Sequence, residues 1–385
     1  MVEVAGYRRP TLGNRTAWVL LAFCLIGVGC ARSRQSIESA REMFAAGDLH
    51  TARDTLATLA ESGGPFADPA ALDLAMIELA AGDVTTAESR LRRLRDRFDA
   101  QPKIAPVGEA VSLVTDDRAR TFRPSGYEQV MIRAALAVCS LAGDGSDAES
   151  YVMQAAMKQD ELAKLAGERG VLDAANVYQP IALAPYLRGM LREATHRDYD
   201  DAARSYRLVS TVRPQFAPAE ADIARASGGT HSAPGHGVLY VIGCVGRGPV
   251  LRETTAPTTS TALSIASAVL NAETNKQEDG KVDAPVLPNI ASVKIPEVVL
   301  PPCNLAAIGA QIDGTWFGAT QTLTDVGELA GRQNEAERPW TLARAVVRRA
   351  TKEATVAKVG DSMGLDGQAG SCLLYTSPSP RDQRP

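Results

Sequence analysis

The sequence is poor in the residues that most catalytic and metal-binding sites use. Among its 385 residues, four are histidine and six are cysteine, and aromatic residues make up only 5%. An excess of charge of one sign is also lacking, because 41 basic residues nearly balance 45 acidic ones and leave a net charge of −4. This balance argues against a strongly basic nucleic-acid-binding protein. The 45% hydrophobic and 22% charged content argues against a disordered chain.

Motifs that would indicate an enzyme are missing as well. The sequence has no P-loop and no nucleophile elbow, and the run Gly243-Cys-Val-Gly246-Arg-Gly248 lacks the spacing of the dinucleotide-binding fingerprint. His231 and His236 flank a Pro-Gly linker that offers no further metal ligands. We therefore expect no catalytic residue, no cofactor and no metal. One alternative stays open, namely an envelope enzyme or small-ligand-binding protein that acts on cell-wall material through its second half.

One apolar run stands out near the start of the chain. Ala17–Gly29 is 13 residues long, whereas a helix needs about 20 residues to span a bilayer. Arg8, Arg9 and Arg15 precede it, which is typical of a secretory signal peptide. The run ends in Ile26-Gly27-Val28-Gly29-Cys30, which resembles a bacterial lipobox. We expect residues 1–29 to be removed and Cys30 to carry the lipid; an uncleaved anchor is the alternative.

These features predict a location as well as a modification. Attachment of two or three acyl chains at Cys30 would hold the protein stably on a membrane. The expected place is the periplasmic side of the bacterial cell envelope, at the outer membrane. At the other end, Cys372–Asp382 resembles the translation of a sequencing adapter, so residues 372–385 are expected to be an artefact.

The first half contains an internal repeat. Ala45-Ala46-Gly47-Asp48 recurs 35 residues later as Ala80-Ala81-Gly82-Asp83. In such a pair the glycine can end one helix in a left-handed conformation, and the aspartate can cap the next. A third copy contains Gly143-Asp144, and the fourth is carried by Tyr186, Gly189, Tyr199, Ala202, Tyr206 and Pro214.

This spacing resembles the tetratricopeptide repeat (TPR), which has a period of about 34 residues. Residues 30–227 are therefore expected to form a TPR-like α-solenoid of stacked helix pairs. Such arrays present a concave surface, and we expect an envelope protein or peptide to bind there. The arginine-rich stretch 90–97 within the repeats is interpreted as a solvent-facing helix surface.

The second half changes character after residue 227. Residues 228–237 form a Gly/Pro/His linker, and residues 238–330 are expected to form a strand-rich domain. Its predicted strands are Val238–Val245, Val293–Leu300, Leu305–Ile312 and Thr315–Leu323. Residues 331–371 contain an amphipathic helix that opens at Glu337 and carries Leu342, Val346 and Val347, followed by a truncated end. The predicted fold class is α+β, an α-solenoid followed by a smaller strand-rich domain and a C-terminal helix.

Two cysteines of the second half raise the question of a disulfide. An exported protein permits disulfides, and Cys244 and Cys303 could pair. The alternative is that Cys139, Cys244 and Cys303 are all free, buried thiols. Spacing alone leaves both alternatives open.

A resemblance to one family rests on the order of several short motifs. These are Gly126–Ile132, Leu141–Asp144, Tyr186–Pro214, Val238–Gly243 with Gly248-Pro249, Thr324–Val326 and Arg344–Arg348. In this order they resemble an uncharacterised family of bacterial lipoproteins with a TPR-like region and a C-terminal β-containing domain. The resemblance implies no enzymatic role. We therefore expect a non-enzymatic envelope lipoprotein that acts as a protein-interaction scaffold.

Overall fold

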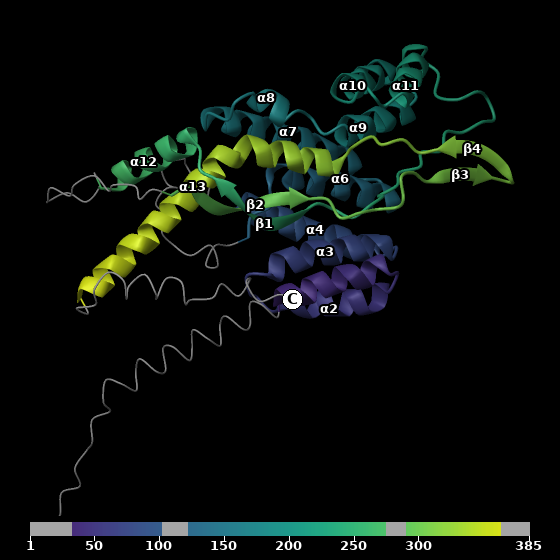
Figure 1. Cartoon of the computed structure of the whole chain (residues 1–385). Helices are drawn as coiled ribbons and strands as arrows, with labels where there is room; N and C mark the ends of the chain where they lie inside the picture. Colours follow the sequence, from purple (N-terminus) through teal and green to yellow (C-terminus); the bar gives the residue numbers. More distant parts are fainter. Residues whose placement is uncertain (1–32, 102–121, 275–289, 363–385) are drawn as a thin grey trace, which may run out of the picture. The chain divides into compact units, whose positions relative to one another are not determined.

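The computed structural model describes residues 33–101, 122–274 and 290–362 (Figure 1). Within these ranges the chain forms two compact units, and the boundary between them lies at Arg90/Leu91. The first unit holds mainly residues 33–90. The second holds residues 91–101 and most of the remaining described chain up to Lys358. The predicted signal segment 1–29, Cys30 and the predicted adapter-derived tail 372–385 lie outside the described residues.

The first unit consists of helices joined by Gly-Asp turns. After a helix over residues 33–45 come α2 (Leu49–Glu61), α3 (Ala67–Ala80) and the start of α4 (Val84–Asp99). Gly47 and Gly82 have φ of +88° and +82°, as a left-handed helix end requires. The carboxylate of Asp48 accepts a hydrogen bond from the Thr51 amide at 3.1 Å, and that of Asp83 from the Thr86 amide at 3.4 Å. Both predicted Gly-Asp turns therefore form.

Three helices contribute side chains to the hydrophobic core of this unit. The buried apolar side chains come from residues 33–45, α2 and α3, and they pack into one cluster: Ile37, Ala40, Ala52, Leu56, Ala70, Leu74 and Ile77. Small alanines next to large leucines let the helices approach closely, as expected for packed helix pairs.

The second unit begins with further helices. They are α6 (Gly126–Ala142), α7 (Ala148–Glu168), α8 (Ala174–Val177), α9 (Leu183–Ala194), α10 (Tyr199–Val212) and α11 (Pro218–Ser227). A capping box starts α6, where the Ser125 amide donates to the Glu128 carboxylate. Pro214 follows the end of α10, as predicted. In the third turn the left-handed glycine is Gly145 (φ +75°), not the predicted Gly143 (φ −95°).

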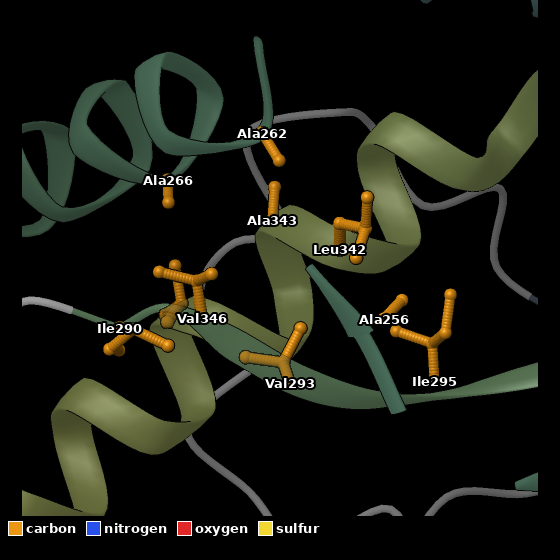
Figure 2. Close-up of a cluster of buried hydrophobic side chains, with 10 residues drawn as sticks. Ala256, Ala262, Ala266, Ile290, Val293, Ile295, Leu342, Ala343 and Val346 are labelled. Atoms are coloured by element: carbon orange, nitrogen blue, oxygen red, sulfur yellow. The ribbon is translucent and has the colours of Figure 1, made fainter. Parts of the chain in front are cut away.

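A small mixed module follows the helices. Strand β1 (Val250–Pro257) pairs antiparallel with β2 (Ser292–Val299) in the register Val250↔Val299 to Pro257↔Ser292. Helix α12 (Ser260–Thr274) lies between them in sequence, and the long helix α13 (Val326–Ser362) covers the module. Figure 2 shows Leu342, Ala343 and Val346 of α13 packed beside side chains from β1, β2 and α12.

A second two-stranded sheet is a hairpin. Strand β3 (Gly309–Ile312) pairs antiparallel with β4 (Thr315–Ala319). The observed β2 and β3 overlap the predicted strands Val293–Leu300 and Leu305–Ile312, and β4 is shorter than predicted. The described residues thus form helices with two small antiparallel sheets, a mixed architecture compatible with the predicted α+β class.

Three sequence predictions for the second half differ from the structure. Val238–Val245 is extended but is not part of a sheet. Residues 303–308 lie beside this segment. The contacts that place the two segments together are those of Gly243 with the Ile308 side chain and of Gly246 with Cys303.

The other two differences concern helices. Helix α12 forms in a stretch for which no helix was predicted, and Ala262 and Ala266 recur there at helical spacing and are buried. Helix α13 begins at Val326 instead of Glu337, since Asp325 caps it by accepting from the Glu328 amide at 3.0 Å. The proposed boundary at residues 330/331 therefore lies inside α13. Among the described residues, no helix combines the length and apolar character needed to cross a membrane.

Candidate functional site

Aromatic side chains of the predicted fourth repeat pack together in the second unit. The Tyr186 ring of α9 lies 5.7 Å from the Tyr206 ring of α10, and also 5.7 Å from the Phe216 ring. Gly189 makes this packing feasible, since a Cβ added there would lie 2.5 Å from Cε1 of Tyr206. Tyr199, also assigned to this repeat, lies outside the cluster and near His196.

A fully buried carboxylate lies beside these rings. Glu193 of α9 accepts hydrogen bonds from Nε and Nη2 of Arg225 at 2.5 and 2.8 Å. The Tyr206 hydroxyl donates to the same carboxylate at 2.8 Å, and the Tyr240 hydroxyl at 3.3 Å. Asp222 binds Nη1 of Arg225 at 2.8 Å. We call these five residues the Glu193 network; they connect α9, α10 and α11 (Figure 1) with the segment that follows them.

The network keeps Glu193 ionised. Burial alone would favour its neutral form, but the hydrogen bonds and charge of Arg225, with the Tyr206 hydroxyl, hold the pKa below its ordinary value. The carboxylates of Glu193 and Asp222 in turn raise the pKa of Arg225. Asp222 differs, because burial raises its pKa despite Arg225, and its Oδ2 is buried without a hydrogen-bond partner among the described residues.

The hydrogen bonds of the network enclose the Glu193 carboxylate. Donors from three side chains surround the Glu193 carboxylate, and it has no access to solvent. Tyr240 extends the network beyond the helices, since its ring also contacts that of Tyr186 at 6.4 Å. The extended segment 238–245 is thereby attached to the last helices. Its predicted role as a strand is replaced by this anchoring role.

Sequence reasoning missed Glu193, although a signal for it was present. Tyr186, Gly189, Met190 and Glu193 have the spacing i, i+3, i+4 and i+7, which places the glutamate on the apolar side of α9. A carboxylate on a buried helix face requires a partner. The identity of that partner, Arg225, could not be read from sequence because it lies 32 residues further along the chain.

The arginine-rich stretch faces neighbouring helices more than was expected. In the first unit, Nη2 of Arg90 lies 2.7 Å from the buried carboxylate of Glu78. In the second unit, Arg92 binds Asp147 and the Tyr151 hydroxyl, and Nη1 of Arg95 donates to Gln154 at 2.9 Å. The prediction of a solvent-facing surface is therefore wrong for Arg90 and Arg95, whereas Arg92 pairs with its neighbours and stays exposed.

Among the described residues, Cys244 and Cys303 are not joined by a disulfide. Cys139 is buried, while Cys244 and Cys303 are exposed. The Cys303 sulfur accepts from the Leu305 amide at 3.4 Å, and it lies 3.9 Å from where a Cβ at Gly246 would be. Cys303 thus lies near the residue two positions after Cys244. Their pairing stays a prediction, as does the lipid on Cys30, which lies outside the described residues.

The structure brings two histidines of the second unit close together. His196 and His231 have ring centroids 4.9 Å apart, a proximity that sequence did not indicate. Across the described ranges, no group of three or more His, Cys, Asp or Glu side chains could hold a metal ion.

Exposed methionines mark one helix of the second unit. Met153 and Met157 are separated by one turn of α7 and both are exposed, Met157 by 68%. We call these two residues the methionine face. Flexible, polarisable methionine side chains are common on protein surfaces that bind other proteins.

Comparisons of the chain with protein-family models, with curated proteins and with solved structures found no match.

Proposed function

We propose that this chain is a non-enzymatic lipoprotein of the bacterial cell envelope whose TPR-like helical repeats bind another protein or peptide. The observation that carries the proposal is repetition. The two turns at Gly47-Asp48 and Gly82-Asp83 share the left-handed glycine and the capping aspartate, 35 residues apart. Repeated helix pairs of this kind serve mainly as binding scaffolds.

The methionine face is the proposed contact for the partner. A protein surface with exposed, adaptable methionines can bury them against an apolar segment. In α7 the opposite face is already used inside the molecule, where Tyr151, Val152 and Ala155 are buried. Met153 and Met157 are therefore the residues of α7 best placed for a partner.

The first experiment is site-specific photo-cross-linking in living cells that express the full chain. A photoreactive amino acid at Met157 should capture one reproducible envelope protein. The matched control places the same group at Arg204 of α10, whose side chain is 75% exposed. Equal capture from both positions, or no capture alongside a hydrolytic activity of the protein, would contradict the proposal.

The proposed membrane anchor is tested separately. Cys30→Ser removes the thiol that would receive the lipid, so we expect the protein to leave the membrane fraction. The measurement is the distribution of protein between membrane and soluble fractions. If the variant stays in the membrane through residues 17–29, the segment is an uncleaved anchor and the lipobox interpretation fails.

A further inference from the structure

The sequence contains four Asp-Gly pairs, and two of them, Asp144-Gly145 and Asp313-Gly314, lie in the part of the chain that the structure describes. In such a pair the backbone nitrogen of the glycine can attack the side-chain carboxyl carbon of the aspartate. Glycine favours this reaction because it has no Cβ to hinder the approach. The two pairs contain the same reacting residues, so the structure around them decides which pair reacts.

The Asp144-Gly145 pair is held at both reacting groups. The Gly145 amide donates to the Ser140 carbonyl at 2.7 Å. The Asp144 carboxylate accepts from the Ser146 amide at 3.0 Å and from the Ser146 hydroxyl at 2.8 Å. The bond from the amide, and after it that from the hydroxyl, lowers the pKa of Asp144. An ionised carboxylate has no hydroxyl group to lose, so both partners of the reaction are blocked.

The Asp313-Gly314 pair forms the turn of the β3–β4 hairpin. Both residues are exposed, and their φ values are +49° and +80°. They connect the paired residues Ile312 and Thr315, as in a two-residue hairpin turn. The Gly314 carbonyl accepts from Nε2 of Gln311 at 3.0 Å. Among the described residues, however, neither the Asp313 carboxylate nor the Gly314 amide nitrogen has a hydrogen-bond partner.

The hairpin also lets this turn change conformation. The attack requires a rotation of the Asp313 backbone away from its turn conformation. Positive φ is unfavourable for a residue with a side chain, so little is lost when Asp313 leaves it. The sheet of β3 and β4 has two strands, and such ribbons are marginally stable in water. Local opening of the hairpin therefore gives the Gly314 nitrogen access to Cγ of Asp313.

We propose that Asp313 is the site of a spontaneous modification, the conversion of aspartate to isoaspartate. The Gly314 nitrogen loses its proton and forms a bond to Cγ of the protonated Asp313 carboxyl group, whose hydroxyl leaves as water. The product is a five-membered succinimide ring. Water then attacks the main-chain carbonyl carbon of Asp313 and breaks its bond to the Gly314 nitrogen. The chain now runs through Cβ and Cγ, and the former main-chain carbonyl is a free carboxylate.

This modification goes beyond the proposed function, because it concerns the hairpin and not the helical repeats. Isoaspartate adds one carbon to the main chain of the turn, so the turn no longer fits the pairing of Ile312 with Thr315. The Trp316 ring lies against Gly309 of the opposite strand, where an added Cβ would be 2.4 Å from Cη2 of the ring. This close contact depends on the strand register. An aged molecule should therefore have a disrupted hairpin.

The test is ageing of the full chain at neutral pH and physiological temperature, followed by peptide mapping. Trypsin places Asp313 in a peptide of residues 295–332 and Asp144 in a peptide of residues 134–158. A protease that cleaves before aspartate but not before isoaspartate then measures conversion at each site. We expect Asp313 to convert about tenfold faster than Asp144, the factor that corresponds to one retained hydrogen bond to a charged group.

Two controls separate the effect of the structure from that of the sequence. In a chain unfolded in urea, both sites should convert at similar rates, because the hydrogen bonds around Asp144 are lost. The variant Asp313→Glu keeps the charge but would need a less favourable six-membered ring. Conversion at position 313 should then stop, while conversion at Asp144 should stay unchanged.

Specific outcomes would overturn the inference. One is equal conversion of Asp144 and Asp313 in the folded chain. Another is a folded chain in which Asp313 stays unconverted although the urea-unfolded chain converts, because the turn would then protect this pair as well. Hydrogen exchange tests the consequence for the hairpin. It should be faster in residues 309–319 of the aged protein than of the fresh protein, and unchanged exchange would contradict the expected disruption.

Discussion

At the scale of single residues, Glu193 shows how a charge can stabilise a helical core. The carboxylate is fully buried, yet Arg225, Tyr206 and Tyr240 all donate to it. A buried ion pair contributes little compared with an apolar core, but the loss of one partner is costly because the other charge stays buried. Removal of the Glu193 charge should therefore destabilise the protein by more than the net contribution of the ion pair to stability.

Glu193→Gln should lower the free energy of unfolding by about 3 kcal/mol at neutral pH. The pKa of Glu193 is held below its ordinary value of 4.5, so its stabilisation is present above that value and is lost as pH falls through the lowered pKa. The difference between variant and wild type should therefore shrink in acid. Urea titrations at several pH values measure it.

The control for this prediction is Glu328→Gln. Glu328 pairs with Arg213 at 2.8 Å, but its side chain is 53% exposed, so the loss should stay below about 1 kcal/mol. Asp222 has the opposite pH dependence, because its raised pKa makes its contribution favourable in acid and lost as pH rises through that pKa. Equal losses for both glutamine variants would show that burial of Glu193 is not what matters.

At the scale of helices, the close contact of α9 with α10 depends on one glycine. The Tyr206 ring occupies the space that a side chain at Gly189 would need, and its hydroxyl is held by Glu193. The ring is therefore fixed at both ends and cannot move aside. This arrangement explains why a small residue lies opposite a large one in the predicted fourth repeat.

Gly189→Ala should destabilise the protein by about 2 kcal/mol, because the added methyl group overpacks the interface. Gly167→Ala is the matched control on α7, where a Cβ meets no atom within 4 Å. That variant should gain about 0.5–1 kcal/mol from helix propensity. Thermal unfolding measures both effects: the melting temperature should fall for Gly189→Ala and rise for Gly167→Ala. Stabilisation of both variants would contradict the described packing.

At the scale of the whole molecule, α13 joins two parts of the second unit. Before Pro339 it contacts the helices, where Leu329 packs with Val130, and Glu337 accepts from the Tyr178 hydroxyl at 2.5 Å. After Pro339, its apolar residues close the β1–β2–α12 module (Figure 2). One helix thus serves two cores, which sequence reasoning had assigned to separate domains.

Gln333 provides a direct measure of this connection. Its side-chain oxygen accepts from the Tyr127 amide at 3.0 Å, at the start of α6. Gln333→Ala leaves that amide without its partner, at a cost of about 1–3 kcal/mol. Hydrogen exchange of the Tyr127 amide should become about tenfold faster or more.

Glu335→Ala provides the control for this effect. Its side chain is 69% exposed and pairs only locally with Arg338, so exchange at Tyr127 should stay unchanged. Exchange in the β1–β2–α12 module should also stay unchanged in both variants. Faster exchange throughout the second unit would mean that α13 couples the two cores more strongly than its contacts suggest.

Part of the fold could be predicted because it depends on neighbours in the chain. The turns at Gly47 and Gly82, the end of α10 at Pro214, and the buried stripe of Leu342, Val346 and Val347 all follow from local conformational preference and helical periodicity. The prediction of a strand at Val238–Val245 was wrong because strand pairing depends on distant residues. Its strand propensity is high, but a sheet also needs a partner strand, and whether a distant segment supplies one cannot be read from local sequence.

The features of the candidate sites also fall into two groups, those that follow from local sequence and those that depend on tertiary contacts. By itself the sequence determined the helix caps, the repeat spacing and the Asp-Gly pairs, since each can be read along the chain. Only the tertiary structure decided that Glu193 meets Arg225 and Tyr240, that Gln333 meets Tyr127, and that the Gly145 amide is bonded whereas the turn at Asp313 stays exposed. Local preference acts between residues a few positions apart. Burial and pairing depend on which distant segments meet, and these contacts are settled only when the whole chain packs.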